Sequence, residues 1–370
     1  MAKSEDSVTS TIITKIEAIR NANPDNLMAR HFDADYFRNL DDQNQKRLLA
    51  VIATGIENSD SQMGAYAMQN DDYELFAPML DPMIRDYHGI SEDKPIKQAH
   101  DRQPDGSTSD LTTIDAGLEE VSMRVRVARN VSGFPLAGAM SRSQRVELEN
   151  LLINAFKTLI NEPGFGGKYL SLTPDNPYEI GAVEYNQRVS DHQMFKDMSA
   201  DRYLSVAGIS SDWPWGRGMY ISEDEGFLVW VGEEDQLRIM AMQRGGDLAG
   251  LFERLEIGIH RLEAMLPPFA HSPKYGYLTS CPTNLGAGMR ASLHVPLPKL
   301  TNGGSDMERV KRAAGEFSLA VRGAGGEHSD AGGDGLVDIS PSARLGVTEA
   351  QIMQSLFNGT AALWALEKQA

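Results

Sequence analysis

Apolar and polar positions follow two different periods along this chain. In STIITKIEAIR and NQKRLLAVIATGIEN, both within residues 1–88, apolar residues recur every three or four positions, which is typical of amphipathic helices. Beyond about residue 118, apolar residues instead alternate with polar ones in EVSMRVRVAR, GFLVWVGEEDQLRIMAM and MRASLHVPL, and this alternation predicts strands. The pattern therefore predicts a helical N-terminal domain followed by a larger domain that contains a sheet.

Long amphipathic helices are predicted between these strands. One of them, in GDLAGLFERLEIGIHRLEAML, has an apolar stripe made of Leu248, Leu251, Leu255, Ile259, Leu262 and Leu266. The last helix begins with Thr348-Glu349-Ala350-Gln351, the pattern of a capping box. Residues 89–117 are rich in Gly, Pro, Ser and Asp, as linkers are. We therefore expect an α+β chain with an all-α domain at 1–88, a linker at 89–117 and a larger domain at 118–370.

Composition excludes several classes of partner. The chain has 35 Lys and Arg against 52 Asp and Glu, a net charge of −17, so most of its surface repels nucleic-acid phosphates. No apolar run is long enough to span a bilayer, the opening MAKSEDSVTS lacks the apolar region of a signal peptide, and a single cysteine fits a reducing compartment. We expect a cytoplasmic protein with neither a nucleic-acid nor a membrane partner.

Three of the predicted strands carry arginine on one face. Because residues two apart on a strand share a face, each of these strands has a polar side and an apolar side. Clustered guanidinium groups repel one another unless an anion lies among them, and a polyphosphate suits their planar hydrogen bonding. Taken singly, each arginine more commonly pairs with a surface carboxylate. The polar-face residues are Arg124, Arg126, Glu234, Arg238, Arg290, Ser292 and His294.

Two further segments are candidates for chemistry. The glycine-rich stretch RGAGGEHSDAGGDGL at 322–336 adds Arg322 and Glu327, and so much glycine is typical either of a loop that closes over a ligand or of a plain surface loop. The only cysteine, Cys281, lies in SCPTNLG, where it is either a reactive thiol or a small buried apolar residue. The sequence contains neither a GxxxxGK[ST] phosphate-binding loop nor a zinc-ligand spacing.

The motif CPTNLG followed by an arginine-bearing strand resembles the signature of the phosphagen kinases, which transfer phosphate between ATP and guanidino compounds. LFAPMLDPMIRDYHG, SMRVRVAR, FLVWVGEEDQLRIMAMQ with GGDL, RGAGGEH through VDIS, and RLGVTE resemble further motifs of that family in the same order, along nearly the whole chain. The resemblance implies a small all-α domain followed by a catalytic domain with an antiparallel sheet flanked by helices. The fold of that catalytic domain is similar to that of glutamine synthetase. It also implies that the larger domain binds ATP.

The resemblance implies a role for each matching residue. ATP or ADP would enter with Mg²⁺ held by the nucleotide and by no protein side chain. The guanidino substrate would be bound by the loop residues Ser61, Gln62, Met63 and Tyr66, together with Glu234, Cys281 and Glu327, and catalysis would involve Glu234, Glu327, Cys281 and Arg238. Ser280 and Thr283 are expected to favour a Cys281 thiolate. The nucleotide would be bound by Ser122, Arg124, Arg126, His192, Arg238, Arg290, His294 and Arg322.

The loop at 58–66 has the short form seen in arginine kinases, and Tyr87 and Glu327 agree with that choice. We therefore expect L-arginine as the substrate of a monomer or homodimer, in a reaction that buffers cellular energy. Another guanidino substrate such as taurocyamine, phosphorylation of protein arginine, a cysteine-dependent guanidino hydrolase and a binding-only pseudoenzyme remain alternatives. Gln62 and Gln236 depart from the family pattern, and the role of residues 198–212 stays open.

Overall fold

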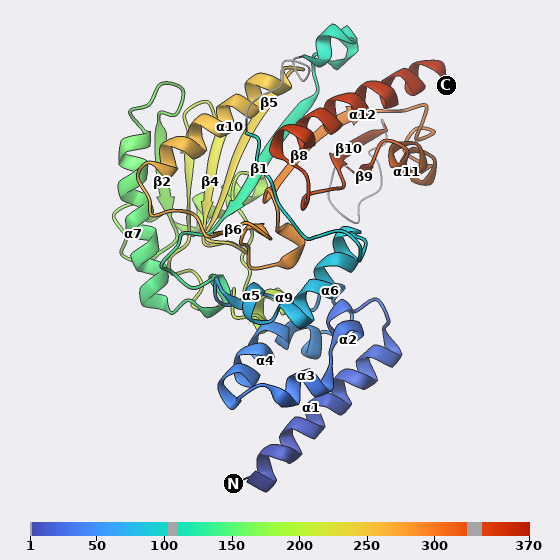
Figure 1. The fold of residues 1–370 in the computed structure, drawn as a ribbon. Helices are drawn as coiled ribbons and strands as arrows, with labels where there is room; N and C mark the ends of the chain where they lie inside the picture. Colours follow the sequence, from blue (N-terminus) through green and yellow to red (C-terminus); the bar gives the residue numbers. More distant parts are fainter. Residues whose placement is uncertain (1, 103–109, 324–334) are drawn as a thin grey trace.

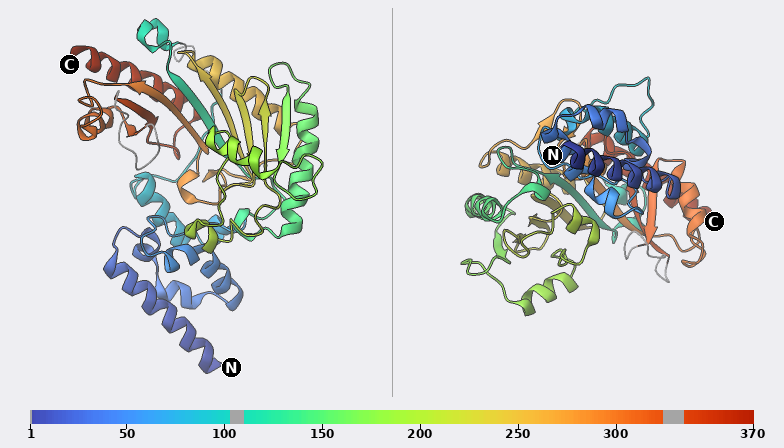
Figure 2. Two further views of the ribbon diagram at one scale, coloured as in Figure 1. Left: turned by 180° about the vertical axis from the view of Figure 1, so that it is seen from behind. Right: turned by 90° about the horizontal axis from the view of Figure 1, so that it is seen from below.

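The computed structural model describes residues 2–102, 110–323 and 335–370. It has a helical domain that contains the N-terminus and a larger domain built on a sheet, with the two termini at opposite ends of the molecule (Figures 1 and 2). The helices of the first domain are α1 (Ala2–Ala22), α2 (Leu27–His31), α3 (Ala34–Asn39), α4 (Asp42–Glu57), α5 (Asp72–Leu75) and α6 (Ala77–His88).

Local capping fixes where these helices begin and end. The Asp41 side chain accepts a hydrogen bond from the Asn44 N–H at the start of α4, and α6 ends at Gly89, whose φ of 65° is the left-handed conformation that glycine adopts without strain. The apolar stripes of the helices then meet in one core. Its fully buried members include Ile16, Leu48, Ile52, Phe76 and Leu80.

The larger domain contains an eight-stranded sheet in the order β2-β3-β4-β5-β1-β8-β10-β9, and all neighbouring strands are antiparallel. The predicted α+β fold with an antiparallel sheet is thereby confirmed. The strands are β1 (Ser122–Arg129), β2 (Gly167–Ser171), β3 (Gly218–Ser222), β4 (Phe227–Val231), β5 (Leu237–Arg244), β8 (Met289–Pro296), β9 (Leu319–Gly323) and β10 (Leu336–Pro341), with a separate two-stranded sheet of β6 (His271–Ser272) and β7 (Gly276–Tyr277).

Three long helices cover the apolar face of the sheet: α7 (Arg142–Leu159), α10 (Leu248–Glu263) and α12 (Glu349–Gln369) (Figure 1). The predicted leucine stripe of α10 is buried in this core, and Thr348 forms the predicted capping box with Gln351. The remaining α-helices are α8 (Ala182–Ser190), α9 (Arg202–Val206) and α11 (Met307–Gly315), and short 3-10 turns occur at Leu111–Thr113, Ala116–Leu118, Ala137–Ala139 and Pro282–Asn284. Among the described helices, none combines the length and the apolar character that crossing a membrane requires.

The segment around Cys281 packs on the helical domain rather than on the core of its own sheet. Cys281 is buried together with the side chains of α4 and α6. Two hydrogen bonds fix the preceding residues: the Tyr73 hydroxyl donates to Thr279 O at 2.7 Å, and the Ala67 N–H donates to Ser280 O at 2.7 Å. The loop that contains Cys281 is therefore positioned by the helical domain. The boundaries proposed above, with a linker at 89–117, stay a prediction.

Candidate active site

Strand register brings the predicted arginines together on one face of the sheet. Directly opposite residues of antiparallel neighbours share a face, and Arg126 of β1 lies opposite Arg290 of β8 and Met240 of β5. One step along, Arg124 lies opposite Ser292. A third row runs through Ser122, His294, Asp338 and Arg322 across four neighbouring strands. The strand alternation read from the sequence therefore corresponds to one continuous polar surface.

Arg124 and Arg126 form no close ion pair on the described part of this surface, although Glu233 acts on both of them electrostatically. Neither makes a hydrogen bond or ion pair within the described part of the chain. Burial, followed by the charge of Arg238, lowers the pKa of Arg124 to about 10 and that of Arg126 well below its ordinary value. Both stay cationic at neutral pH, because arginine titrates far above it. This surface is thus prepared for an anion that supplies the missing charge.

Arg238 connects the arginine surface to a group of carboxylates. Its Nη2 lies 2.7 Å from Glu233 Oε2 and 3.8 Å from Glu234 Oε2, and its guanidinium stacks 5.3 Å from the centre of the Trp230 ring. The expectation that Glu234 lies on a strand with Arg238 is wrong. β4 ends at Val231 and β5 begins at Leu237, so both glutamates lie in the connecting turn, where Gly232 has a φ of 72°.

Two adjacent acidic residues of this turn have different surroundings. Asp235 accepts hydrogen bonds at 2.7 Å from Asn130 Nδ2 and from the Ser280 N–H, so its carboxylate is held in place. Glu234 accepts one longer hydrogen bond, from Asn284 Nδ2 at 3.4 Å, and lies 3.8 Å from Arg238 Nη2. Burial, and then the charges of Asp235 and Glu233, raises the pKa of Glu234 to about 7. Glu234 is therefore suited to accept a proton near neutral pH.

Cys281 lies beside Glu234, and its thiol differs from the expectation. The Sγ atom is 3.1 Å from Thr283 Oγ1, while Ser280 uses its backbone N–H on Asp235. Burial and the Glu234 charge raise the pKa of the Cys281 thiol to about 12. The expected thiolate is therefore disfavoured in this structure, because desolvation and a neighbouring negative charge outweigh one hydroxyl.

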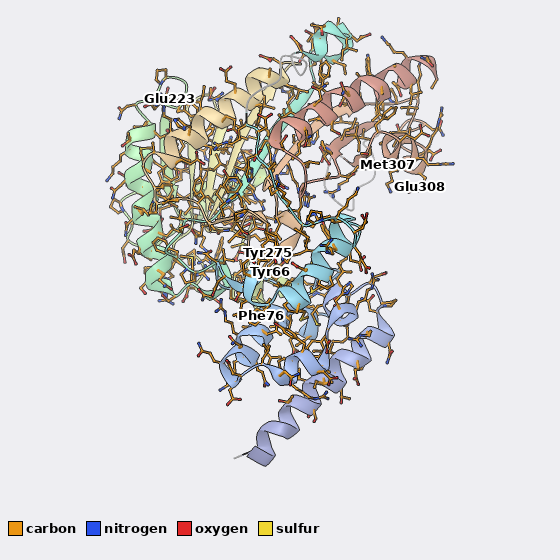
Figure 3. All side chains as sticks on the ribbon, viewed as in Figure 1. Tyr66, Phe76, Glu223, Tyr275, Met307 and Glu308 are labelled. Atoms are coloured by element: carbon orange, nitrogen blue, oxygen red, sulfur yellow. The ribbon has the colours of Figure 1, made fainter. Side chains whose placement is uncertain are left out.

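A cavity of about 370 Å³ adjoins these carboxylates and contains part of the predicted substrate loop. Glu233 and Glu234 line it, as do Ser61, Gln62 and Tyr66. Tyr66 lies where the helical domain meets the larger domain (Figure 3), and both Glu234 and Asp201 act electrostatically on its hydroxyl. The cavity therefore joins elements of both domains.

The predicted substrate loop, residues 58–66, is held by internal hydrogen bonds. The Ser61 N–H donates to Asn58 O at 2.9 Å, and the Gly64 N–H donates to Ser61 Oγ at 3.1 Å. The Met63 side chain is buried in the helical core and does not line the cavity. The backbone N–H groups of Gln62 and Met63 are engaged by no hydrogen bond in the described chain. Of the three loop residues Ser61, Gln62 and Met63, the latter two therefore have backbone N–H groups available for a ligand.

The segment 198–212, for which the sequence indicated no role, contributes residues to the lining of this cavity. Its helix α9 packs on α4 of the helical domain. Arg202 forms an ion pair with Asp60, and the Tyr203 hydroxyl donates to the same carboxylate at 3.0 Å. Thr54 Oγ1 donates to Tyr203 O at 3.2 Å. The segment thus connects the substrate loop to the larger domain.

Of two further predicted site residues, one makes no hydrogen bond or ion pair with this arrangement and the other is not described. His192 follows α8 in an exposed turn with a φ of 58°, while its neighbour Gln193 accepts a hydrogen bond at 2.6 Å from Trp230 Nε1. Glu327 lies outside the described residues. His294 remains on the arginine surface, with Nε2 3.8 Å from Asp338 Oδ1.

Sequence reasoning missed three acidic residues of the site. Asp338 shares the polar face of β10, and the alternation in LVDIS at 336–340 is a signal that would have found it. Glu233 precedes Glu234, but only the turn geometry shows that it pairs with Arg238. Asp201 lines the cavity from a segment whose position no sequence pattern reveals.

Gln236, the departure from the family motif, has a structural task. It is buried, its Oε1 accepts from the Val131 N–H at 2.7 Å, and its Nε2 donates to Pro135 O at 2.9 Å. The side chain therefore braces the chain after β1 and does not line the cavity.

Comparison with known proteins gives consistent matches. A family model described as the ATP:guanido phosphotransferase N-terminal domain matches residues 22–85, and one described as its C-terminal catalytic domain matches residues 147–370. An arginine kinase of Penaeus japonicus is 37% identical over 360 residues, 96% of either chain. An arginine kinase of Limulus polyphemus is 37% identical over 350 residues, 93% of either chain.

Solved structures of similar fold act on other guanidino compounds, according to their names. The duplicated taurocyamine kinase from Schistosoma mansoni, with bound transition state analog components, superposes with a TM-score of 0.82 at 32% identity. That match covers 98% of this chain and 48% of the duplicated one. A lombricine kinase superposes with a TM-score of 0.78 at 27% identity, covering 93% of this chain and 92% of the other.

Proposed function

Because the chain belongs to the ATP:guanido phosphotransferase family, the phosphagen kinases, we propose that it reversibly transfers the γ-phosphoryl group of MgATP to the guanidino group of L-arginine. The products are phosphoarginine and ADP, and the reaction buffers ATP in the cytoplasm. One observation carries the proposal: Glu234 lies between the arginine surface and the cavity that contains Tyr66. The charges of Arg238 and Arg290 act on Glu234 and partly oppose the rise in its pKa.

The arginine surface is proposed as the nucleotide site. Arg124 and Arg126 make no hydrogen bond or close ion pair among the described residues, so polyphosphate oxygens would replace the repulsion between the arginines with bidentate hydrogen bonds. Arg238 forms ion pairs with Glu233 and Glu234, which supports a proposed role for Arg238 beside the group transferred between the two substrates. Charge on the oxygens of that group is then stabilised by groups already in place.

The cavity is proposed as the guanidino site. A guanidinium is a poor nucleophile because its nitrogen electrons are delocalised over a cation. Glu234 would hold one N–H, align that nitrogen with the phosphorus, and accept the proton as the new bond forms. Its pKa of about 7 favours this exchange near neutral pH. Cys281 would contact the same guanidinium, and Glu327 remains a proposed second carboxylate. Most of the acceleration comes from alignment of two bound substrates.

Magnesium is proposed to arrive on the nucleotide, where it neutralises phosphate charge. The described residues contain no group of three or more His, Cys, Asp or Glu side chains placed to hold a metal. Magnesium keeps much of its water and commonly binds through substrate phosphates, so the uncompensated arginines fit a nucleotide that brings its own ion.

Taurocyamine is the second candidate, because the similar taurocyamine kinase has the same fold at 32% identity. A cysteine hydrolase gains no support, since the raised pKa of Cys281 disfavours the thiolate that such an enzyme needs. It would also leave the arginine surface without a task.

The deciding experiment measures ADP production from MgATP with L-arginine, taurocyamine, creatine and an arginine-containing peptide. Turnover with L-arginine that is lost in Glu234→Gln and retained in Glu253→Gln, an exposed carboxylate of α10, supports the proposal. Preference for taurocyamine would keep the chemistry and overturn the substrate. Turnover of the peptide instead would point to protein arginine. Failure with all four compounds would overturn the proposed reaction.

A further inference from the structure

The cavity contains a second pair of carboxylates, which the proposed phosphoryl transfer does not use. Asp60 belongs to the substrate loop and Asp201 precedes α9, and both line the cavity together with Tyr66. Since Glu234 and Asp201 both act on the Tyr66 hydroxyl, Asp201 lies within electrostatic reach of the proposed guanidino site.

These two carboxylates differ in their partners. Asp60 is neutralised by its ion pair with Arg202, and the hydrogen bonds from Tyr203 and Arg202 lower its pKa. Asp201 uses only Oδ1, which accepts the Tyr203 and Leu204 N–H groups at 2.9 Å and so caps α9. Its Oδ2 has neither a hydrogen bond nor a cationic partner in the described chain. Asp201 is exposed and lines the cavity, so it adds there a carboxylate that no cation of the described chain pairs with.

Guanidino compounds share a head group and differ in their tails. The tail of L-arginine carries an ammonium and a carboxylate, the tail of taurocyamine carries only a sulfonate, and that of creatine carries only a carboxylate. The loop amides of Gln62 and Met63 suit an anion in every case, because both lack a partner among the described residues. An acidic group nearby attracts the first kind of tail and repels the other two.

On the basis of the proposed function, we propose that Asp201 is a specificity-determining residue that selects guanidino substrates with a cationic group in the tail. Its free Oδ2 binds the α-ammonium of an amino-acid substrate while the loop amides bind the carboxylate. Tails that carry only an anion meet the same negative charge without compensation. This assigns to the segment 198–212 a direct part in substrate choice.

The test compares wild-type protein with Asp201→Asn on L-arginine and on 5-guanidinopentanoate, which is arginine without its α-amino group. Asparagine retains an oxygen that can cap α9, so the change removes charge and preserves the cap. We expect the kcat/KM for L-arginine to fall about three- to tenfold, chiefly through KM, because single ion pairs that solvent can reach are weak. The value for 5-guanidinopentanoate, whose tail carries only a carboxylate, should instead rise, because the variant removes a charge that repels that carboxylate.

Asp60→Asn is the matched control. It weakens the ion pair with Arg202 that joins the loop to α9, so it should lower kcat/KM for both compounds by a similar factor. If Asp201→Asn also lowered both values equally, Asp201 would act only through α9 and the inference would be overturned. An unchanged ratio of the two values would overturn it as well.

Failure of the proposed substrate has a separate signature. If the wild-type protein turned over taurocyamine and not L-arginine, the choice of arginine would be wrong. The inference then requires that Asp201→Asn increase kcat/KM for taurocyamine, because the variant removes a charge that repels the sulfonate. A value that stayed the same or fell would overturn the inference.

Discussion

Arg217 differs from Arg124 and Arg126 of the same domain in its hydrogen-bond partners. Arg217 of β3 is fully buried, and its guanidinium donates to four carbonyl oxygens, those of Ile209, Ser211, Trp215 and Gly232. Arg124 and Arg126 of β1 are partly buried, yet they lack any hydrogen bond or ion pair within the described chain. The fold supplies acceptors for four of the five N–H groups of Arg217 and gives Arg124 and Arg126 none among the described residues.

This difference distinguishes a structural arginine from two arginines that we propose bind the nucleotide. A buried cation without partners raises the free energy of the folded state. A protein retains such a cation when a bound ligand offsets that cost. Burial lowers the pKa of Arg217 to about 9, and the pKa of Arg126 also falls well below its ordinary value. The pKa direction is thus shared, and only the hydrogen-bond partners distinguish the two roles.

Arg126→Gln should produce the largest effect. It removes a cation from the proposed phosphate site, so kcat/KM should fall by about 10³-fold or more, the order found for arginines that stabilise transferring phosphoryl groups. The free energy of unfolding should not fall, because the lost charge was repelled by Arg124, Arg238 and Arg290. Urea unfolding and steady-state kinetics measure the two quantities, and ADP should raise the melting temperature of the wild type more than that of the variant.

An exposed arginine of α11 supplies the control for this prediction. Arg312→Gln should change neither quantity measurably, since Arg312 lies away from the sheet surface. A variant at Arg126 that lost stability and kept its kinetics would show that Arg126 is structural and would remove the contrast with Arg217.

Glu234 offers the acidic form of the same contrast, because Asp235 beside it is satisfied by two N–H donors. Glu234→Gln should lower kcat about 10²- to 10⁴-fold, the range for losing general base catalysis. The folded state raises the pKa of Glu234 from 4.5 to about 7. Its contribution to stability is therefore complete below pH 4.5 and lost as pH rises through about 7, where the buried group ionises.

Glutamine cannot ionise, so the variant should be more stable than wild type by about 1–3 kcal/mol at pH 8. The difference should vanish near pH 4.5, where the wild-type side chain is neutral. Urea unfolding at both pH values tests the sign, and the kcat/KM of the wild type should fall below about pH 7. An equal stability difference at the two pH values would mean that Glu234 does not titrate as its surroundings indicate.

Arg217→Met should reverse the pattern seen at Arg126. Methionine fills similar space and leaves four carbonyl oxygens without a donor, so the free energy of unfolding should fall by about 3–5 kcal/mol. One of these carbonyls belongs to Gly232, which begins the turn that carries Glu233 and Glu234, so weaker activity should accompany the loss. Thermal and urea unfolding provide the measurement. A loss below about 1 kcal/mol would show that carbonyl partners do not define the structural class.

Periodicity made most of the fold predictable. The arginine strands and the α10 stripe follow from spacing within one element, and spacing is local information. Hydrogen-bond partners do not follow from spacing in this way. The four carbonyls that surround Arg217 lie two to fifteen residues from it, but only the turns of the folded chain bring them to one guanidinium, so no sequence pattern distinguishes Arg217 from Arg126. The resemblance supplied roles for the site residues, and those roles stay predictions.

The same limit explains the two errors at the site. Alternation was extended through residues 232–236, where Gly232 turns the chain and moves Glu234 off the strand. The Cys281 thiol was judged by its sequence neighbours, whereas Glu234, distant in sequence, dominates its surroundings together with burial. Asp201 was missed for this reason too, since it meets Tyr66 only in the folded chain.

Gln236→Leu should have the smallest effect and refine the contrast most finely. The side chain is buried near the site, but its amide is fully engaged by the Val131 N–H and Pro135 O, as a structural group should be. Leucine should cost about 1–2 kcal/mol of unfolding free energy by leaving both groups unpaired. The KM for L-arginine should change less than twofold. Gln236→Glu can still accept from the Val131 N–H but has no amide to donate to Pro135 O. Its free energy of unfolding should therefore lie between those of the wild type and Gln236→Leu. If KM rose tenfold without loss of stability, Gln236 would belong with Arg126 as a binding residue, and engagement by the fold would no longer separate the two classes.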